Sequence, residues 1–289
     1  METSAVRDDG LVANFFRPST SGKHAGIIVI GGAGGGLGSA SAVGSLLAER
    51  GYATLALAYF GVEDLPRQLQ EIPLEYFKRA VIWLRAHPSV EPSKIGLVGT
   101  SKGGEAALLV GATYEEIRAV AAYSPSHVVF QGIDEAWSDS SVSKSSWTLH
   151  GEPVPFVPFR MDNDCIERYG FYLGLYLASL QDRQAPGRAV IPVERINGPI
   201  LLFSGTDDAI WPSSMMCERV VERLKQHDFR FSFRHLRYDG AGHLLAGPSR
   251  PSSAGSIEGL PTGGTERANA AARDDAWTKV CTFFGVYLK

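Results

Sequence analysis

Six short apolar segments recur along the chain, each with the length and content of a buried strand. Most of them are rich in Ile, Val, Leu and Ala, and carry apolar residues at consecutive positions rather than at every second one. Strands that are buried on both faces of a parallel sheet have this pattern. The segments cover residues 25–32, 52–59, 94–100, 119–125, 199–205 and 233–240.

Segments with helical spacing separate these strands. In residues 73–88, Leu74, Phe77, Val81 and Leu84 fall on one face, and Pro88 stops the helix. Residues 41–51, 105–112, 213–228 and 271–288 are also predicted to be helical. The alternation of strands and helices predicts an α/β fold whose mostly parallel sheet is covered by helices on both faces.

Two long stretches interrupt this alternation. Residues 126–195 are rich in Trp, Phe and Pro and include a helical aromatic segment, so we expect a lid-like insertion above the sheet. Residues 247–269 are rich in Gly, Ser and Pro and are predicted to form a mobile loop, because a final helix still follows. We therefore expect residues 1–289 to form a single domain.

Composition narrows the class of partner. The chain has 289 residues, of which 44% are hydrophobic, and a net charge of −3. Basic residues are scattered, so we expect neither nucleic acid nor an anionic membrane as a partner. Cys165, Cys217 and Cys281 lie far apart, which argues against a disulfide framework or a structural zinc site.

The chain lacks an apolar run of about 18 residues and a basic, apolar start typical of signal peptides. We therefore expect a cytoplasmic protein with no membrane span. The oligomeric state is left open.

The pattern Gly99-x-Ser101-x-Gly103 is the sharpest chemical signal in the sequence. Alone it is weak, because glycine and serine are common. Its context strengthens it, since an apolar strand precedes the serine and a helix follows, as a nucleophile elbow requires. Ser101 is therefore the candidate nucleophile.

A serine hydroxyl needs a base, and the base needs an orienting carboxylate. In α/β hydrolases these residues follow the serine in the order acid, then histidine. Asp208 lies three residues after the glycine that ends a buried strand, with Asp207 as the alternative acid, and His243 lies in a glycine-containing loop after the next strand. None of the other six histidines has that context.

The glycine-rich segment 31–38 also follows a strand. As the first crossover loop of a hydrolase, it would supply a backbone N–H that joins the N–H of Lys102 in an oxyanion hole. Ala33 is our choice of donor, with Gly32 and Gly34 as alternatives. The Lys102 side chain is expected to be solvated, or else to meet an anionic group of the substrate.

Cofactor sites are not indicated. A dinucleotide loop would need an acidic residue at the end of the next strand, where Tyr59 stands instead. The acidic segment 160–167 lacks the glycine and closing glutamate of a calcium loop and is predicted to be a solvated loop, and no metal-ligand spacing occurs among the histidines. We expect neither a cofactor nor a metal.

Several ordered blocks resemble one family, the acyl-CoA thioesterases and bile acid-CoA:amino acid N-acyltransferases, from about residue 25 to the end. The blocks are LALAYFGVEDLP, IPLEYFKRAVIWLRAHPSV, GLVGTSKGGE, SSWTLHGEPVPFVPF, IPVERINGPILLFSGTDDAIWPS and DAWTKVCTFF. The resemblance implies an α/β-hydrolase fold, acyl transfer from a thioester, and a triad at Ser101, Asp208 and His243.

Two departures from the family matter. Members often carry a β-sandwich domain before the catalytic one, whereas only about 25 residues precede the first strand expected here. The amino-acid-conjugating branch has a cysteine nucleophile, so Ser101 favours hydrolysis. The sequence thus predicts a serine hydrolase of acyl thioesters, with three alternatives: a carboxylester or lactone hydrolase resembling dienelactone hydrolase, an acyltransferase of a biosynthetic pathway, or a binding protein.

Overall fold

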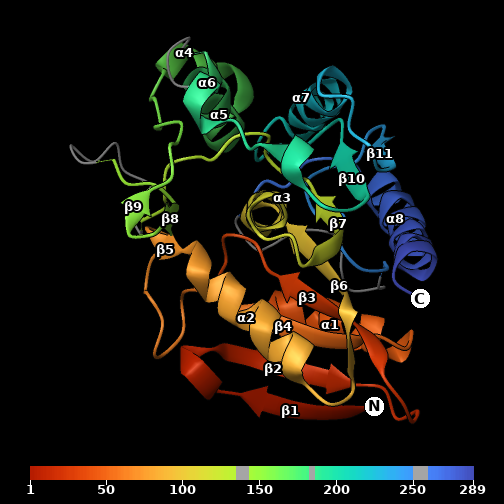
Figure 1. Ribbon diagram of the computed structural model, residues 1–289. Coiled ribbons are helices and arrows are strands. Elements are labelled where there is room, and N and C mark those ends of the chain that lie inside the picture. Colours follow the sequence, from red (N-terminus) through yellow and green to blue (C-terminus); the bar gives the residue numbers. More distant parts are fainter. Residues whose placement is uncertain (135–142, 182–185, 250–259) are drawn as a thin grey trace.

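The computed structural model describes residues 1–134, 143–181, 186–249 and 260–289, which build an eight-stranded sheet (Figure 1). The strand order is β1-β2-β4-β3-β6-β7-β10-β11. Strand β2 runs antiparallel to both neighbours, and the pairs from β4 to β11 are all parallel. The strands are β1 (Glu2–Val6), β2 (Val12–Arg17), β3 (His24–Ile30), β4 (Ala53–Ala58), β6 (Val90–Thr100), β7 (Ile117–Tyr123), β10 (Ile200–Gly205) and β11 (Phe233–Tyr238).

Helices cover both faces of this sheet, and each face has its own apolar core. Alternate strand residues such as Ile28 and Leu97 pack with α2, α3 and α7, whereas Val29 and Val98 pack with α1 and α8. The fold is therefore an α/β sandwich of three layers, as predicted. The covering helices are α1 (Gly38–Glu49), α2 (Leu74–Ala86), α3 (Lys102–Thr113), α7 (Ser213–Gln226) and α8 (Glu266–Tyr287).

The six predicted strands match β3, β4, β6, β7, β10 and β11, and the predicted helices match the five that cover the sheet. The prediction that residues 233–240 are buried was wrong, because β11 lies at the sheet edge and its residues are partly or fully exposed. The antiparallel strands β1 and β2 were not predicted, so the sheet begins near the N-terminus rather than at about residue 25. Strand β1 lies at the sheet edge with exposed residues over Glu2–Ala5, and it therefore lacks the apolar run of a buried strand.

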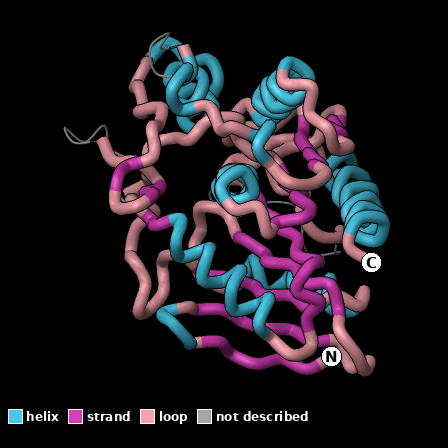
Figure 2. Tube along the Cα trace, viewed as in Figure 1, coloured by secondary structure: helices cyan, strands magenta, loops and turns pink. Residues whose placement is uncertain are grey.

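The insertion between β7 and β10 consists of short helices, short strands and loops beside the sheet (Figure 2). Phe130, Trp147 and Tyr176 from this insertion are fully buried in the core. Its described elements, besides the short η2 (Val193–Arg195), are β8 (Trp147–Leu149), β9 (Glu152–Pro153), α4 (Asn163–Tyr169), α5 (Phe171–Leu180) and α6 (Pro186–Ala189), and β8 pairs with β5 (Ile72–Pro73). The predicted aromatic helix is two helices because Gly170, with φ of 82°, separates α4 from α5.

The predicted loop at 247–269 is shorter than expected at its C-terminal end. Helix α8 begins at Glu266, where the Thr265 hydroxyl accepts a hydrogen bond from the N–H of Ala268. Residues 250–259 of that prediction lie outside the described residues, as do 135–142 and 182–185 of the insertion. No helix in the described part of the chain is both long and apolar enough to cross a membrane.

Candidate active site

Ser101 lies at a tight turn between β6 and α3. Its φ and ψ are 58° and −123°, a conformation that is rare for residues other than glycine. A Cβ atom on Gly99 would lie 2.0 Å from the carbonyl oxygen of Gly103, and one on Gly103 would lie 2.2 Å from that of Gly31. The two glycines are therefore required by close backbone contacts, and Ser101 has the geometry of a nucleophile elbow.

The loops after β10 and β11 bring Asp208 and His243 together. The Oδ2 atom of Asp208 lies 2.8 Å from Nδ1 of His243, and both side chains are buried. The other oxygen, Oδ1, accepts hydrogen bonds from the N–H groups of Ile210 (2.9 Å) and Trp211 (3.2 Å). An acceptor-only carboxylate at Nδ1 makes that nitrogen the donor, which leaves Nε2 as the basic nitrogen.

Of the two acids weighed from the sequence, Asp208 is the one beside His243. Asp207 is exposed, and its Oδ1 accepts a hydrogen bond from the Thr206 hydroxyl. The N–H of Asp207 donates to the carbonyl of Ala241. With the backbone held there, the Asp207 side chain faces solvent and the Asp208 side chain faces the interior.

Backbone contacts connect the elbow to the histidine loop. The N–H of Ser101 donates to the carbonyl of Tyr123 at the end of β7 (2.8 Å), and the next residue, Ser124, donates from its hydroxyl to the carbonyl of His243 (2.7 Å). The Ser101 hydroxyl itself makes no hydrogen bond with any described residue, and 9% of the residue is exposed. The three predicted residues thus follow the carboxyl ends of β6, β10 and β11, and β7 lies between β6 and β10 in the sheet.

The glycine-rich loop after β3 lies against Ser101. A Cβ atom on Gly32 would be 3.2 Å from the Cβ of Ser101. The buried Tyr59 hydroxyl, at the end of β4, donates to the carbonyl of Gly31 (2.9 Å) and fixes the loop there. The N–H groups of Ala33 and Lys102 donate to no acceptor among the described residues, so both remain available to an oxyanion.

The side chain of Lys102 corrects the expectation of a solvated helix-start lysine. Only 1% of it is exposed, and its Nζ lies 2.6 Å from Oε1 of the fully buried Glu105. The indole Nε1 of Trp147 donates to the same oxygen (2.8 Å). Burial lowers the pKa of Lys102 and raises that of Glu105, and each shift is opposed by the charge of the other group. Lys102 therefore carries a structural ion pair.

Sequence reasoning missed the roles of Tyr59 and Trp147 beside the elbow. Tyr59 served only to argue against a dinucleotide site, and Trp147 only as part of an apolar insertion. Their rings pack against each other, with centroids 5.7 Å apart. A large aromatic residue with a polar atom, placed where a strand ends or in a buried insertion, is the signal that could have indicated them.

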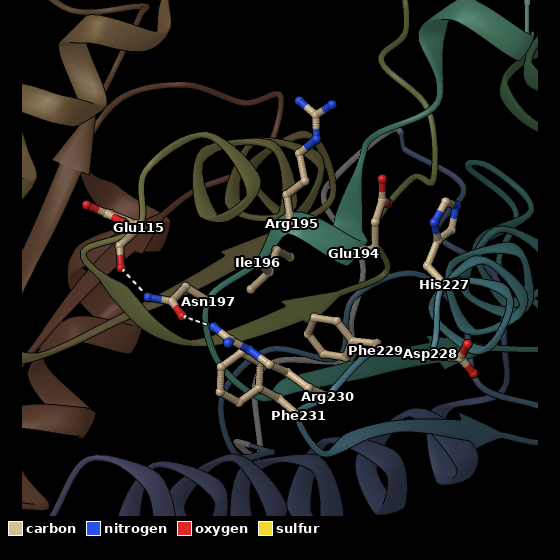
Figure 3. A pocket seen from close by; sticks show the side chains of 10 residues that line it. All are labelled: Glu115, Glu194, Arg195, Ile196, Asn197, His227, Asp228, Phe229, Arg230 and Phe231. Carbon is tan, nitrogen blue, oxygen red and sulfur yellow. Dashed lines mark hydrogen bonds between the residues drawn. The ribbon is translucent and has the colours of Figure 1, made fainter.

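A hollow of about 500 Å³ lies elsewhere on the molecule (Figure 3). Its lining residues precede β7, β10 and β11 in the chain, so the hollow lies at the amino ends of these strands. Ser101, Asp208 and His243 instead follow the carboxyl ends of strands. Asn197 and Arg230 are hydrogen-bonded across it. This hollow is therefore separate from the candidate active site.

No group of three or more His, Cys, Asp or Glu side chains within the described ranges is arranged to hold a metal ion. The acidic segment 160–167 was predicted to be a solvated loop. It instead enters α4, where Asp162 accepts a hydrogen bond from the N–H of Cys165 and caps the helix.

Comparison with known proteins identifies relatives of the whole domain. Acyl-coenzyme A thioesterase 2, mitochondrial, of Mus musculus is 33% identical over 284 residues, which cover 96% of this chain and 59% of that protein. Acyl-coenzyme A amino acid N-acyltransferase 1 of Mus musculus is 34% identical over 279 residues, covering 94% and 62%. The chain thus spans about three fifths of the length of these relatives.

Solved structures support the fold. A dienelactone hydrolase-like promiscuous phosphotriesterase from metagenomic libraries superimposes with a TM-score of 0.62 at 16% identity and covers 100% of this chain and 98% of its own. An alpha/beta hydrolase from a deep-sea metagenome library gives a TM-score of 0.57 at 17% identity, covering 100% and 98%. The chain therefore has an α/β-hydrolase fold.

The family described as "BAAT / Acyl-CoA thioester hydrolase C terminal" matches residues 72–289, which include the elbow, the acid loop and the histidine loop. The resemblance of the sequence blocks predicted this relationship. The chain belongs to the BAAT / acyl-CoA thioester hydrolase C-terminal family.

Proposed function

We propose that this protein hydrolyses acyl thioesters of the acyl-CoA class by way of an acyl-serine intermediate. The observation that supports the proposal is that a strained Ser101 turn and the buried Asp208–His243 pair all follow carboxyl ends of parallel strands, and that the adjacent residues Tyr123 and Ser124 hydrogen-bond Ser101 and His243. Membership of a family whose relatives include acyl-coenzyme A thioesterases supports the thioester as the bond that is cleaved.

In the first step, Nε2 of His243 takes the proton of the Ser101 hydroxyl while Oγ attacks the thioester carbonyl carbon. Asp208 stabilises the imidazolium through Nδ1. The bond from carbon to sulfur then breaks, and the thiolate leaves with the proton from His243. In the second step His243 deprotonates a water molecule, which attacks the acyl-serine, and the acid is released as Ser101 regains its proton.

The carbonyl oxygen becomes negatively charged in both steps. The unoccupied N–H groups of Lys102 and Ala33 would stabilise that charge, together with the N-terminus of α3. A hydrogen bond between Ser101 and His243 is the remaining requirement, and such bonds often tighten only when substrate is bound.

The decisive experiment replaces Ser101 with alanine. We expect Ser101→Ala to lower kcat toward the best acyl-CoA substrate by about 10⁴-fold or more, and to abolish labelling by a fluorophosphonate probe. Ser45→Ala on α1, whose hydroxyl bonds only the carbonyl of Ala42, is the matched control and should leave both unchanged. A Ser101→Ala protein that retains near-normal turnover would refute the mechanism.

Substrate class is tested by comparing acyl-CoAs with p-nitrophenyl esters of matched chain length. Higher kcat/KM for the thioesters supports the proposal, whereas preference for esters or lactones supports the carboxylester alternative. The relative named as an amino acid N-acyltransferase makes acyl transfer the second candidate. Free amino acids added to the reaction would then yield N-acyl amino acids by mass spectrometry, in place of the free acid.

A further inference from the structure

Ser124 is a second strained serine beside the elbow. It follows β7, is fully buried, and has a φ of 44°, which is unfavourable for a residue with a Cβ atom. Its N–H donates to the carbonyl of Phe203 on the neighbouring strand β10 (2.7 Å). The position is thus held by the central sheet.

The Ser124 side chain holds the loop that carries the candidate base. Its hydroxyl donates to the backbone carbonyl of His243 (2.7 Å), and the N–H of His243 donates to the carbonyl of Thr262 (2.8 Å). Both backbone groups of His243 are therefore fixed. Since the Asp208 carboxylate also fixes Nδ1, the remaining freedom of the imidazole is small.

The Ser124 backbone holds the acid loop as well. Its carbonyl accepts a hydrogen bond from the indole Nε1 of Trp211 (3.0 Å), and the backbone N–H of Trp211 donates to Asp208. The indole ring also packs edge-on against the His243 imidazole, with centroids 5.8 Å apart. Ser124 thus contacts both loops that carry the Asp208–His243 pair.

We propose that Ser124 is a positioning residue that sets the location of the His243 imidazole relative to Ser101. This inference rests on the proposed function. A buried hydroxyl that bonds the carbonyl of the base itself controls where Nε2 lies, and a displacement of about 1 Å in such a site can lower the rate about 100-fold. The Ser124 hydroxyl makes the contact with His243, while the Ser124 carbonyl accepts the hydrogen bond from Trp211 in the loop that carries Asp208.

Two substitutions separate the hydroxyl from the backbone strain. Ser124→Ala loses the hydroxyl and keeps the Cβ atom at positive φ, whereas Ser124→Gly loses the hydroxyl and relieves the strain. Thr54→Val is the matched control, because the buried Thr54 hydroxyl of β4 also donates to a backbone carbonyl, that of Gly44 on α1 (2.8 Å). Thermal unfolding is measured beside activity for all three.

We expect both Ser124 variants to lower kcat by about 10- to 100-fold with KM changed less than about two-fold, and to slow fluorophosphonate labelling of Ser101 equally. Ser124→Gly should be as slow as Ser124→Ala although it unfolds at a higher temperature. Thr54→Val should lose stability while keeping normal kcat and labelling.

The proposal is overturned if either Ser124 variant keeps normal kcat and labelling, or if Ser124→Gly recovers activity together with stability. Should Ser124→Ala fail to fold, Ser124→Gly against Thr54→Val gives the same test. An inactive Ser101→Ala beside a fully active Ser124→Gly would refute only the positioning role. An active Ser101→Ala would refute the proposed function itself.

Discussion

Two buried pairs of hydrogen-bonded side chains, Lys102–Glu105 directly after Ser101 and Asp208–His243 in the loops after β10 and β11, come from different surroundings. Lys102 and Glu105 are one turn apart on α3, with 1% and 0% of their side chains exposed. Asp208 and His243 come from different loops, with 2% and 4% exposed, and they join segments 35 residues apart. Burial alone therefore does not distinguish the two pairs.

The two pairs differ in the chemistry of their side chains. An ammonium and a carboxylate in contact stabilise each other as ions, and transfer of a proton between them serves no step of the proposed reaction. Imidazole titrates near neutral pH and keeps Nε2 free when Nδ1 is occupied. We therefore expect the Asp208–His243 pair to control the reaction rate and the Lys102–Glu105 pair to control stability.

The largest expected effect comes from breaking the Asp208–His243 pair. Asp208→Asn keeps an oxygen for the N–H groups of Ile210 and Trp211 but can hold His243 in the wrong tautomer. We expect kcat to fall about 10⁴-fold, with unfolding free energy changed by less than about 2 kcal/mol. Steady-state kinetics and urea unfolding measure the two effects.

Asp207→Asn is the matched control for that variant, because Asp207 is exposed one residue away. It should retain kcat within about two-fold. A normal Asp208→Asn beside an impaired Asp207→Asn would transfer the role of acid to Asp207.

Breaking the Lys102–Glu105 pair should lower the unfolding free energy more than it lowers kcat. Glu105→Gln leaves the Lys102 ammonium buried without its carboxylate, and we expect a loss of about 3–5 kcal/mol of unfolding free energy. The double variant Lys102→Met with Glu105→Leu should recover most of that loss, because it removes both charges. Urea unfolding of both variants gives the values.

The exposed pair Arg219–Glu222 has the same three-residue spacing on α7 and provides the control. Glu222→Gln should change the unfolding free energy by less than about 1 kcal/mol. Equal losses for Glu105→Gln and Glu222→Gln would show that burial does not set the strength of the Lys102–Glu105 pair.

The contrast between the pairs also explains what the sequence could predict. Ser101, Asp208 and His243 each follow a strand, and a local strand-and-loop pattern identifies such positions. Lys102 and Glu105 lie at the start of a helix, where local rules favour exposure. They are buried because Trp147, more than 40 residues later, covers them, and no pattern within α3 indicates that contact.

The formation of β1 and the contacts of Ser124 also depend on residues that local sequence patterns do not indicate. Strand β1 is formed by pairing with β2 at an edge, without an apolar run of its own. Ser124 gains its role from a hydrogen bond to a residue 119 positions away. Local periodicity predicts elements and their order, whereas partners across the fold depend on packing that the periodicity does not encode.

His127, a partly buried residue, contrasts with both pairs because its buried Nδ1 has no hydrogen-bond partner among the described residues. Burial, with a smaller contribution from Arg219, lowers the pKa of His127 to about 4. The folded state therefore disfavours the imidazolium that the unfolded chain forms below its usual pKa of 6.5. Stability that is present above pH 6.5 should decline by about 3 kcal/mol as the pH falls to 4.

His127→Gln removes this titration. The difference in unfolding free energy between the variant and the original protein should then change between pH 6.5 and 4 and stay constant above that range. Urea unfolding at a series of pH values measures it. A difference that is the same at every pH would exclude His127 as a source of acid sensitivity.

The smallest expected effect concerns the indole that joins the insertion to the Lys102–Glu105 pair. Trp147→Phe keeps an aromatic ring near Lys102 but removes the Nε1 donor to Glu105 and some of the buried ring volume, so we expect a loss of about 2 kcal/mol, measured by urea unfolding. Trp83→Phe is the control, because its indole donates to the carboxylate of Asp8 at the surface (2.9 Å). Water can replace that donor, so its loss should be below about 1 kcal/mol. If the two variants lose equal stability, the carboxylate of Glu105 does not need the insertion as a partner, and the Lys102–Glu105 pair is sustained within α3 alone.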